Sequence, residues 1–170
     1  MMNDDQIQVC ALTVQGPLRL DDVLFQARKA QRLAPLQVVR SDRVLGFDHI
    51  RSAAQHMWRA MEEGRNQADK PEVEFTRYLS GQRTIKDALQ HVGIQDGAPQ
   101  GTVIAFGPER GKAVEYFVEM LGLIEGEPRE PSQQAILDFG IDVAAWEATA
   151  EDRRMDLILE AVAAVDLARS

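Results

Sequence analysis

The sequence contains a single cysteine, Cys10, so it can form neither a disulfide within the chain nor a zinc site built from several cysteines. Its longest uninterrupted apolar runs hold about five residues, whereas a membrane-spanning helix needs roughly 18. The first residues, Met-Met-Asn-Asp-Asp, carry neither the basic nor the apolar region of a secretory signal. These absences predict a protein of the reducing cytoplasm that has no membrane partner.

Positive charge is also in short supply. The formal net charge of the 170 residues is -8, although residues 1–108 balance at 13 basic and 13 acidic residues. The whole negative excess therefore lies in residues 109–170, an acidic and helical last third. A general nucleic-acid-binding protein would be basic, so any RNA contact must be local and lie in the first two-thirds. The alternative is that the acidic third only aids solubility.

The length and the 45% hydrophobic content predict one folded domain over residues 1–170. Alternating apolar residues, with a Gly16-Pro17 stop after the first run, predict strands over residues 7–14, 36–39 and 102–106, the second of which could continue over 44–46. Apolar residues at helical spacing predict helices over 20–33, 48–63, 71–79, 84–92, 110–121, 132–139 and 149 to about 168. Asp48, Thr84, Ser132 and Thr149 are the expected N-terminal caps of four of these helices. The fold class predicted is α+β: a small mixed or antiparallel sheet packed against several helices, with a helix-rich C-terminus.

Few residues have the arrangement that catalysis requires. The turn at residues 107–112 resembles a phosphate loop, but it has too few residues between its glycines and no Ser or Thr after Lys112. His49 and His56 lie about two helical turns, or roughly 10 Å, apart, so one metal ion cannot bridge them. Glu72 and Glu74 read as a solvated helix face, unless Glu74 pairs locally with Arg77 or Tyr78. The sequence thus predicts no enzyme, no cofactor, no metal and no small-molecule substrate.

The most distinctive stretch is the turn Ser80-Gly81-Gln82, where two predicted helices meet. The second helix presents its N-terminal amides together with Arg83 and Lys86, which favours anions. Arg77 on the preceding turn adds charge, and Tyr78 could stack on a base if it is exposed. The alternative is an ordinary helix corner with solvated basic residues.

The same stretch carries an ordered set of motifs: Glu74, then Tyr78-Leu79, then the G-x-R-x-I corner of residues 81–85, then Ala88 and Gly93-Ile94. Upstream, residues 38–64 read VVRSDRVLGFDHIRSAAQHMWRAMEEG, a short strand followed by a His-Ile helix start and an alanine-rich helix. Together these motifs resemble the PRPK-binding protein family, the small non-catalytic subunit of the KEOPS complex. The resemblance covers residues 36–122 well and the two ends loosely.

This resemblance implies a function. KEOPS attaches threonylcarbamoyl to N6 of the adenosine beside the tRNA anticodon, and another subunit performs the chemistry. The small subunit docks on the atypical PRPK-type kinase/ATPase and helps recruit tRNA by its single-stranded CCA end. On the corner motif, the RNA contact is expected at Gly81, Arg83, Ile85 and Lys86, with Arg77 nearby.

An apolar patch must meet the kinase. The expected interface is the last helix, which is apolar on more than one side, through Leu157, Ile158, Ala161 and Val165. The alternative is that these four residues belong to the core. Two other functions stay open: a kinase-regulatory adaptor without RNA contact, which the acidic charge favours, and a small enzyme with an unfamiliar site.

Overall fold

The structure, a computed structural model, describes residues 8–128 and 130–167. The chain packs as two compact units, each made from two separate segments. Unit 1 comprises Met1–Ser41 and Gly93–Arg129, and unit 2 comprises Asp42–Val92 and Glu130–Ser170. Neither unit is continuous in sequence, and the single domain expected over residues 1–170 stays a prediction.

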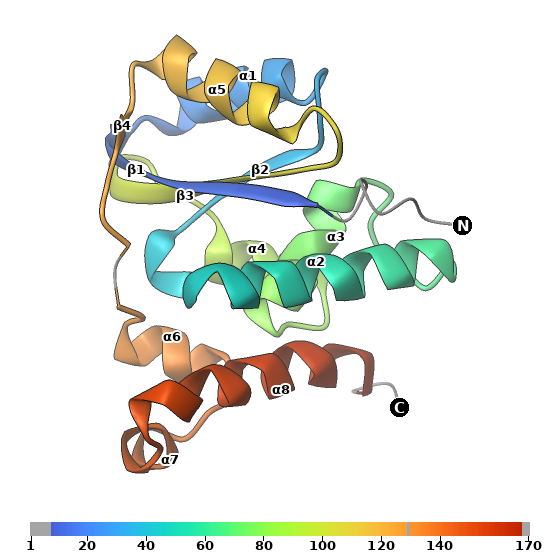
Figure 1. Cartoon of the computed structure of the whole chain (residues 1–170), viewed down its shortest axis with the longest axis vertical. Helices are drawn as coiled ribbons and strands as arrows, with labels where there is room; N and C mark the ends of the chain where they lie inside the picture. The colour runs from blue at the N-terminus through green and yellow to red at the C-terminus, as the bar shows by residue number, and fades with distance from the viewer. Residues whose placement is uncertain (1–7, 129, 168–170) are drawn as a thin grey trace. The chain divides into compact units, whose positions relative to one another are not determined.

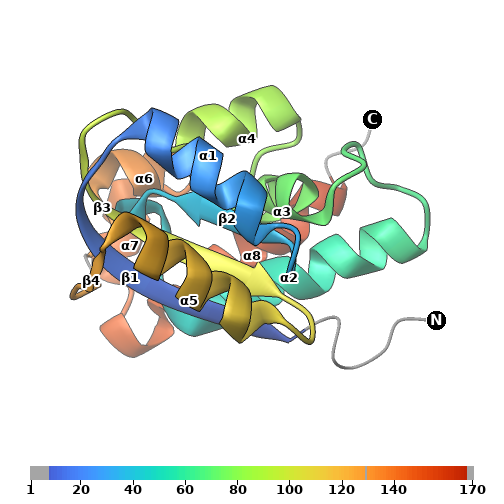
Figure 2. The same ribbon diagram turned by 90° about the horizontal axis from the view of Figure 1, so that it is seen from above.

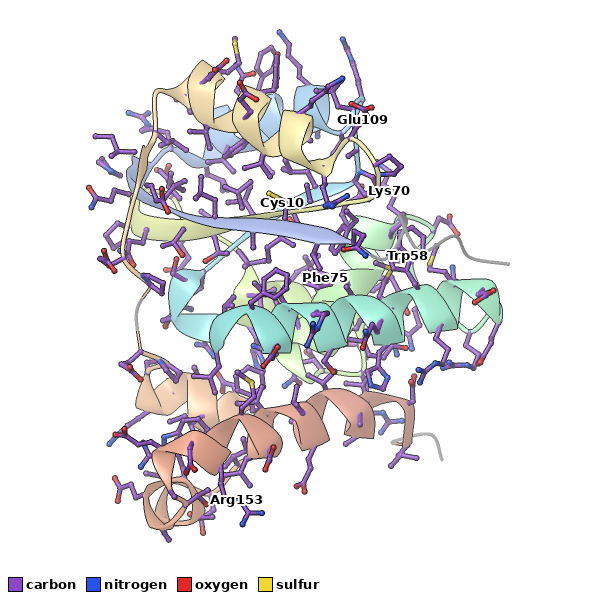
Figure 3. All side chains as sticks on the ribbon, in the orientation of Figure 1. Cys10, Trp58, Lys70, Phe75, Glu109 and Arg153 are labelled. Carbon is purple, nitrogen blue, oxygen red and sulfur yellow. The ribbon has the colours of Figure 1, made fainter. Side chains whose placement is uncertain are left out.

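Unit 1 is a four-stranded antiparallel sheet with two helices on one face (Figures 1 and 2). The strand order is β2-β3-β1-β4. The strands are β1 Val9–Leu18, β2 Leu36–Val39, β3 Ala98–Phe106 and β4 Ile124–Glu125, and the helices are α1 Leu20–Ala30 and α5 Arg110–Leu121. Alternate strand residues such as Val14, Val38 and Val103 pack with Val23 and Phe117 of the helices in one apolar core. Cys10 lies on the same face of β1 and packs against that core (Figure 3).

The first strand is longer than the sequence indicated. Gly16-Pro17 was expected to end it, but β1 continues to Leu18 and pairs there with Ala98 after a shift in register. Glycine makes this continuation possible: a Cβ at Gly16 would lie 2.2 Å from the carbonyl oxygen of Ala98. Ile7, the expected first residue of the strand, lies outside the described residues.

Unit 2 is helical over the described residues. Its elements are the 3-10 turn Ser41–Arg43 at the boundary, α2 Gly46–Glu62, α3 Pro71–Ser80, α4 Ile85–Val92, α6 Gln133–Asp138, α7 Val143–Ala148 and α8 Arg154–Leu167. Helix α3 packs against α2 and α4, and α8 packs against α2 and α3. Ile136, Phe139, Trp146 and Ile158 form a buried cluster between α6, α7 and α8.

Two expected features at the start of α2 are wrong. Residues 44–46 do not extend β2, because the chain turns at the 3-10 helix and α2 already begins at Gly46. Asp48 is not the cap; Leu45 occupies that position without a side-chain cap. The ring of His49 instead fixes the start of the helix, since its Nδ1 accepts a hydrogen bond of 3.0 Å from the backbone N–H of Leu45. The expected caps Thr84 and Ser132 are confirmed, each accepting from a backbone N–H three residues on.

The end of the chain also differs from the expectation. Helix α7 was missed, and Thr149 closes it instead of opening the last helix, with its hydroxyl donating to the carbonyl of Ala145. The 3-10 turn Glu151–Arg153 follows, and α8 begins only at Arg154. The α+β class, the antiparallel sheet and the helical C-terminus are confirmed.

Candidate functional site

Residues 80–86, here called the elbow, join α3 to α4. Helix α3 ends because Gly81 adopts the left-handed conformation, with φ of +70°, which favours glycine. The backbone N–H of Gly81 donates to the carbonyl of Tyr78, and that of Gln82 donates to the carbonyl of Arg77. Helix α4 then starts after Thr84, whose hydroxyl accepts from the N–H of Asp87. The elbow is therefore a defined turn that presents the first turn of α4.

The elbow presents two free cations. Arg83 and Lys86 are exposed, and neither side chain has an ion-pair partner among the described residues. Gly81 and Ile85 are half-buried beside them. Two unpaired positive charges near the positive end of a helix favour an anionic ligand.

Arg77 does not join these cations. It is only 5% exposed, and two of its guanidinium nitrogens donate hydrogen bonds inside unit 2. Nη1 donates to Glu74 Oε2 at 2.5 Å, and Nε donates to the carbonyl oxygen of Arg83 at 2.7 Å. The expectation that Arg77 adds charge to the RNA-facing surface is therefore wrong, because burial and two hydrogen bonds hold the cation away from solvent.

Glu74 is the partner that fixes Arg77. Its side chain is fully buried, so the expected solvated face of Glu72 and Glu74 is wrong, while the local pair of Glu74 with Arg77 is confirmed. The other carboxylate oxygen, Oε1, accepts from the backbone N–H groups of Gln67 and Ala68 at 3.0 and 3.1 Å. A buried carboxylate needs such partners, and here they join the loop before α3 to the elbow.

Tyr78 is also unavailable to a base. It is fully buried, its ring stacks on His56 at 5.8 Å between centroids, and its hydroxyl donates to Asp166 Oδ1 at 2.7 Å. Burial, together with the neighbouring Asp166 carboxylate, raises the pKa of Tyr78 to about 12. Any nucleic-acid contact at the elbow therefore relies on charge and hydrogen bonds and not on this ring.

The elbow also contacts the C-terminal segment of unit 2. The side-chain amide of Gln82 donates to the carbonyl of Asp138 at 2.7 Å, and a Cβ at Gly81 would lie 3.5 Å from Phe139 and 3.8 Å from Ala161. Asp138 in turn forms an ion pair with the buried Arg43. Hydrogen bonds therefore hold the elbow to α3, through Arg77, and to the end of α6, through Gln82.

The four residues expected at the kinase interface divide into two pairs. Ile158 is fully buried and Val165 is only 4% exposed, so for these two the alternative, core packing, is correct. Leu157 and Ala161 are half-buried. The sequence pattern of α8 could not separate the pairs, because its apolar residues lie on more than one side of the helix.

The remaining candidate groups have structural partners. His49 is buried, which lowers its pKa to about 4, and its Nε2 donates to the carbonyl of Leu79 at 2.9 Å. The turn at residues 107–112 is closed by Arg110 bonding to Gly107 and by an ion pair between Lys112 and Glu109. Within residues 8–128 and 130–167, no group of three His, Cys, Asp or Glu side chains could hold a metal ion.

A half-open hollow of about 410 Å³ lies in unit 2, beside the start of α8. Its wall includes Trp146, whose ring lies 5.4 Å from the guanidinium of Arg154. The residues that line it are Leu45, Gly46, Glu130, Trp146, Glu151, Arg154 and Met155. This lining holds no serine, cysteine, lysine or histidine.

The sequence was compared with known families. The family described as kinase binding protein CGI-121 matches residues 20–149, which include the elbow and end before α8. The chain belongs to this family of kinase-binding proteins. This is the PRPK-binding family that the motifs of residues 36–122 resemble. The resemblance is therefore confirmed. A comparison with curated proteins found no match.

Membership of the CGI-121 family indicates that the partner of this chain is a kinase. Among the described residues, no helix is both long and apolar enough to span a membrane. Two interactions of this family member were not foreseen: the contacts of Glu74 with Gln67 and Ala68, and those of Asp166 with Tyr78 and Arg65. Asp166 had a signal in the sequence, an acidic residue within an otherwise apolar helix face, whereas Glu74 had none, because its face also carries the charged Arg77.

Proposed function

We propose that this chain is a cytoplasmic, non-catalytic KEOPS subunit that binds the complex's atypical PRPK-type kinase and recruits tRNA through its 3′ CCA end. Another subunit then forms N6-threonylcarbamoyladenosine. The observation that carries the RNA part of the proposal is the pair of exposed side chains Arg83 and Lys86 at the start of α4, which have no ion-pair partner in residues 8–128 and 130–167. The kinase part rests on membership of the CGI-121 family.

A single-stranded 3′ end suits this surface. It offers phosphates, a free ribose with two hydroxyls and unstacked bases. Arg83 can contact a phosphate in bidentate fashion, and Lys86 adds a point charge three residues away. Gly81 makes the turn that presents both cations, and the half-buried Ile85 supplies an apolar contact for a base.

A gel shift with intact tRNA and with tRNA trimmed of its CCA end tests the RNA proposal. Intact tRNA should bind more tightly, and the double change Arg83→Ala and Lys86→Ala should remove most of that difference. Arg51→Ala is the matched control, because Arg51 is an exposed arginine of unit 2 that is paired with Asp48 at 3.0 Å. Equal binding of the two tRNAs by the wild-type protein would falsify the recruiting role.

A kinase-regulatory adaptor without RNA contact is the second candidate, and the net charge of -8 favours it. Size-exclusion chromatography with a PRPK-type kinase tests what the two candidates share, and the gel shift with tRNA distinguishes them. Both candidates predict a single peak with the kinase, but only the adaptor predicts no shift of tRNA even at low salt.

A further inference from the structure

Arg77 is buried beneath the elbow, the surface that meets the RNA under the proposed function. Its side chain is buried, yet it bonds to two different parts of unit 2: the carboxylate of Glu74 on its own helix and the carbonyl of Arg83 in the elbow. We propose that Arg77 is a positioning residue, which holds the backbone of Arg83 so that Arg83 and Lys86 together fit the CCA end. The inference rests on the proposed function and concerns the same site.

The carbonyl of Arg83 needs such a donor. It lies before Thr84, outside α4, so it has no partner in the hydrogen-bond ladder of that helix. The Nε–H of Arg77 satisfies it at 2.7 Å. This bond sets where the Cα of Arg83 lies, and thereby the point from which its exposed side chain reaches solvent.

The other end of the contact is equally fixed. Glu74 Oε2 accepts from Arg77 Nη1, while its Oε1 accepts from the N–H groups of Gln67 and Ala68. The Arg83 carbonyl is thereby connected through Arg77 and Glu74 to the loop before α3. Charge-assisted bonds of this kind are short and directional, so the elbow backbone is held more firmly than a surface turn.

Arginine is required for this geometry. Its planar guanidinium donates in two directions at once, from Nε and from Nη1. Lysine keeps the charge that neutralises Glu74 but has one nitrogen, so it cannot serve both acceptors in the same way. Arg77→Lys should therefore release Arg83 and leave the buried carboxylate paired.

The test compares wild type with Arg77→Lys and with the control Arg51→Lys. Arg51 forms an ion pair with Asp48, three residues before it on an exposed helix face. The preference for intact over CCA-trimmed tRNA should fall roughly tenfold in Arg77→Lys, because a displaced Arg83 loses one charge-assisted contact with the CCA end. The salt dependence of binding to intact tRNA should stay that of wild type, because both exposed cations remain. Kinase binding should change little, whereas the thermal midpoint should fall slightly because the Arg83 carbonyl loses its donor.

Each other result overturns the inference. An unchanged CCA preference means that Arg77 positions nothing that the RNA reads. A weaker salt dependence means that a phosphate contact of the exposed cations is lost, and not only the fit to the CCA end. Loss of kinase binding in parallel with RNA binding means that Arg77 is only a structural residue. If wild type shows no CCA preference, the proposed function fails first, which the wild-type measurement alone reveals.

Discussion

At the scale of single residues, His49 shows how burial determines a charge state. Its Nδ1 accepts from Leu45, its Nε2 donates to Leu79, and its ring meets Phe139 edge-on at 5.4 Å. Both ring nitrogens are therefore used in the neutral form. Protonation would turn the acceptor Nδ1 into a second donor facing the Leu45 N–H, so the buried ring resists it.

This predicts an acid-sensitive stability. The pKa of His49 is lowered from 6.5 to about 4 in the folded protein, chiefly by burial, so the unfolded chain binds a proton that the folded protein refuses between those values. The free energy of unfolding should therefore be constant above pH 6.5 and fall by roughly 1 kcal/mol per pH unit between 6.5 and 4. Burial also lowers the pKa of His56, which adds a change of the same sign.

Urea denaturation at several pH values between 7.5 and 5 measures this slope. His49→Gln supplies an acceptor and a donor without a titrating ring, so it should be less stable at neutral pH but show a flatter profile. A variant with the slope of wild type would show that His49 is not its source.

Two glycines should respond to alanine with opposite signs. Gly81 has a φ of +70°, where a Cβ is disfavoured, so Gly81→Ala should destabilise the protein by about 1 kcal/mol. Gly111 lies in α5, has an ordinary φ and meets nothing within 4 Å at its Cβ position, so Gly111→Ala should stabilise it by roughly 0.5–1 kcal/mol. Thermal midpoints of the two variants check both signs. Equal effects would contradict the backbone argument.

The sequence predicted the turn at Gly81 but not the burial of Glu74 and Arg77 in the helix before it. A glycine between two helical patterns has few interpretations, whereas Arg77 and Glu74 carry charges that normally face water. Their burial follows from tertiary contacts, with Arg83 six residues from Arg77 and Gln67 seven residues before Glu74. No helical period records such contacts.

At the scale of elements, the carboxylate of Asp166 joins α8 to its neighbours in unit 2. Asp166 Oδ1 accepts from Tyr78 of α3 and from Arg65 after α2, at 2.7 and 2.8 Å. Burial by itself raises the pKa of Asp166, but these two hydrogen bonds and the charges of Arg65 and His56 lower it overall. Helix α8 is therefore attached by charge near its end as well as by its buried residues Ile158, Val162 and Val165.

Removing that carboxylate should weaken unit 2. Asp166→Ala leaves the buried Tyr78 hydroxyl without its acceptor and should lower the free energy of unfolding by about 2 kcal/mol. Asp156→Ala on the same helix is the control, because Asp156 is exposed, lies 3.9 Å from the exposed Arg153 and should matter by less than about 0.5 kcal/mol. Chemical denaturation distinguishes the two variants. Similar losses would mean that Asp166 contributes no more than a surface charge.

Helices with a clear stripe were predictable, and α5 has the expected bounds of 110–121. Helix α7 was not, because its six residues show no helical period, whereas the equally short α6 was indicated by its cap Ser132. β4 has two residues and exists only through its pairing with Val14 and Gln15, which lie more than 100 positions earlier. Short elements of this kind are determined by their neighbours in space and not by their own sequence.

At the scale of the whole molecule, the charge distribution restricts how RNA can bind. The net charge of -8 repels a polyanion, so affinity must come from a few local cations. Within unit 2, Arg43, Arg65 and Arg77 are committed to acidic partners. Arg83 and Lys86 of the elbow, like the exposed Arg59 and Lys70 elsewhere in the unit, have no ion-pair partner among the described residues. The proposed contact is accordingly small.

A shallow salt dependence follows. Each contact between a cation and a single-stranded phosphate contributes about 0.7 to the slope of log K against log salt, so two contacts predict a slope of about -1.4. Titrating intact tRNA at a series of salt concentrations measures it, and the double change Arg83→Ala and Lys86→Ala should bring the CCA-dependent part of the slope close to zero. A wild-type slope steeper than about -3 would contradict the prediction, since the elbow has only two such cations to offer and a further basic surface would have to take part.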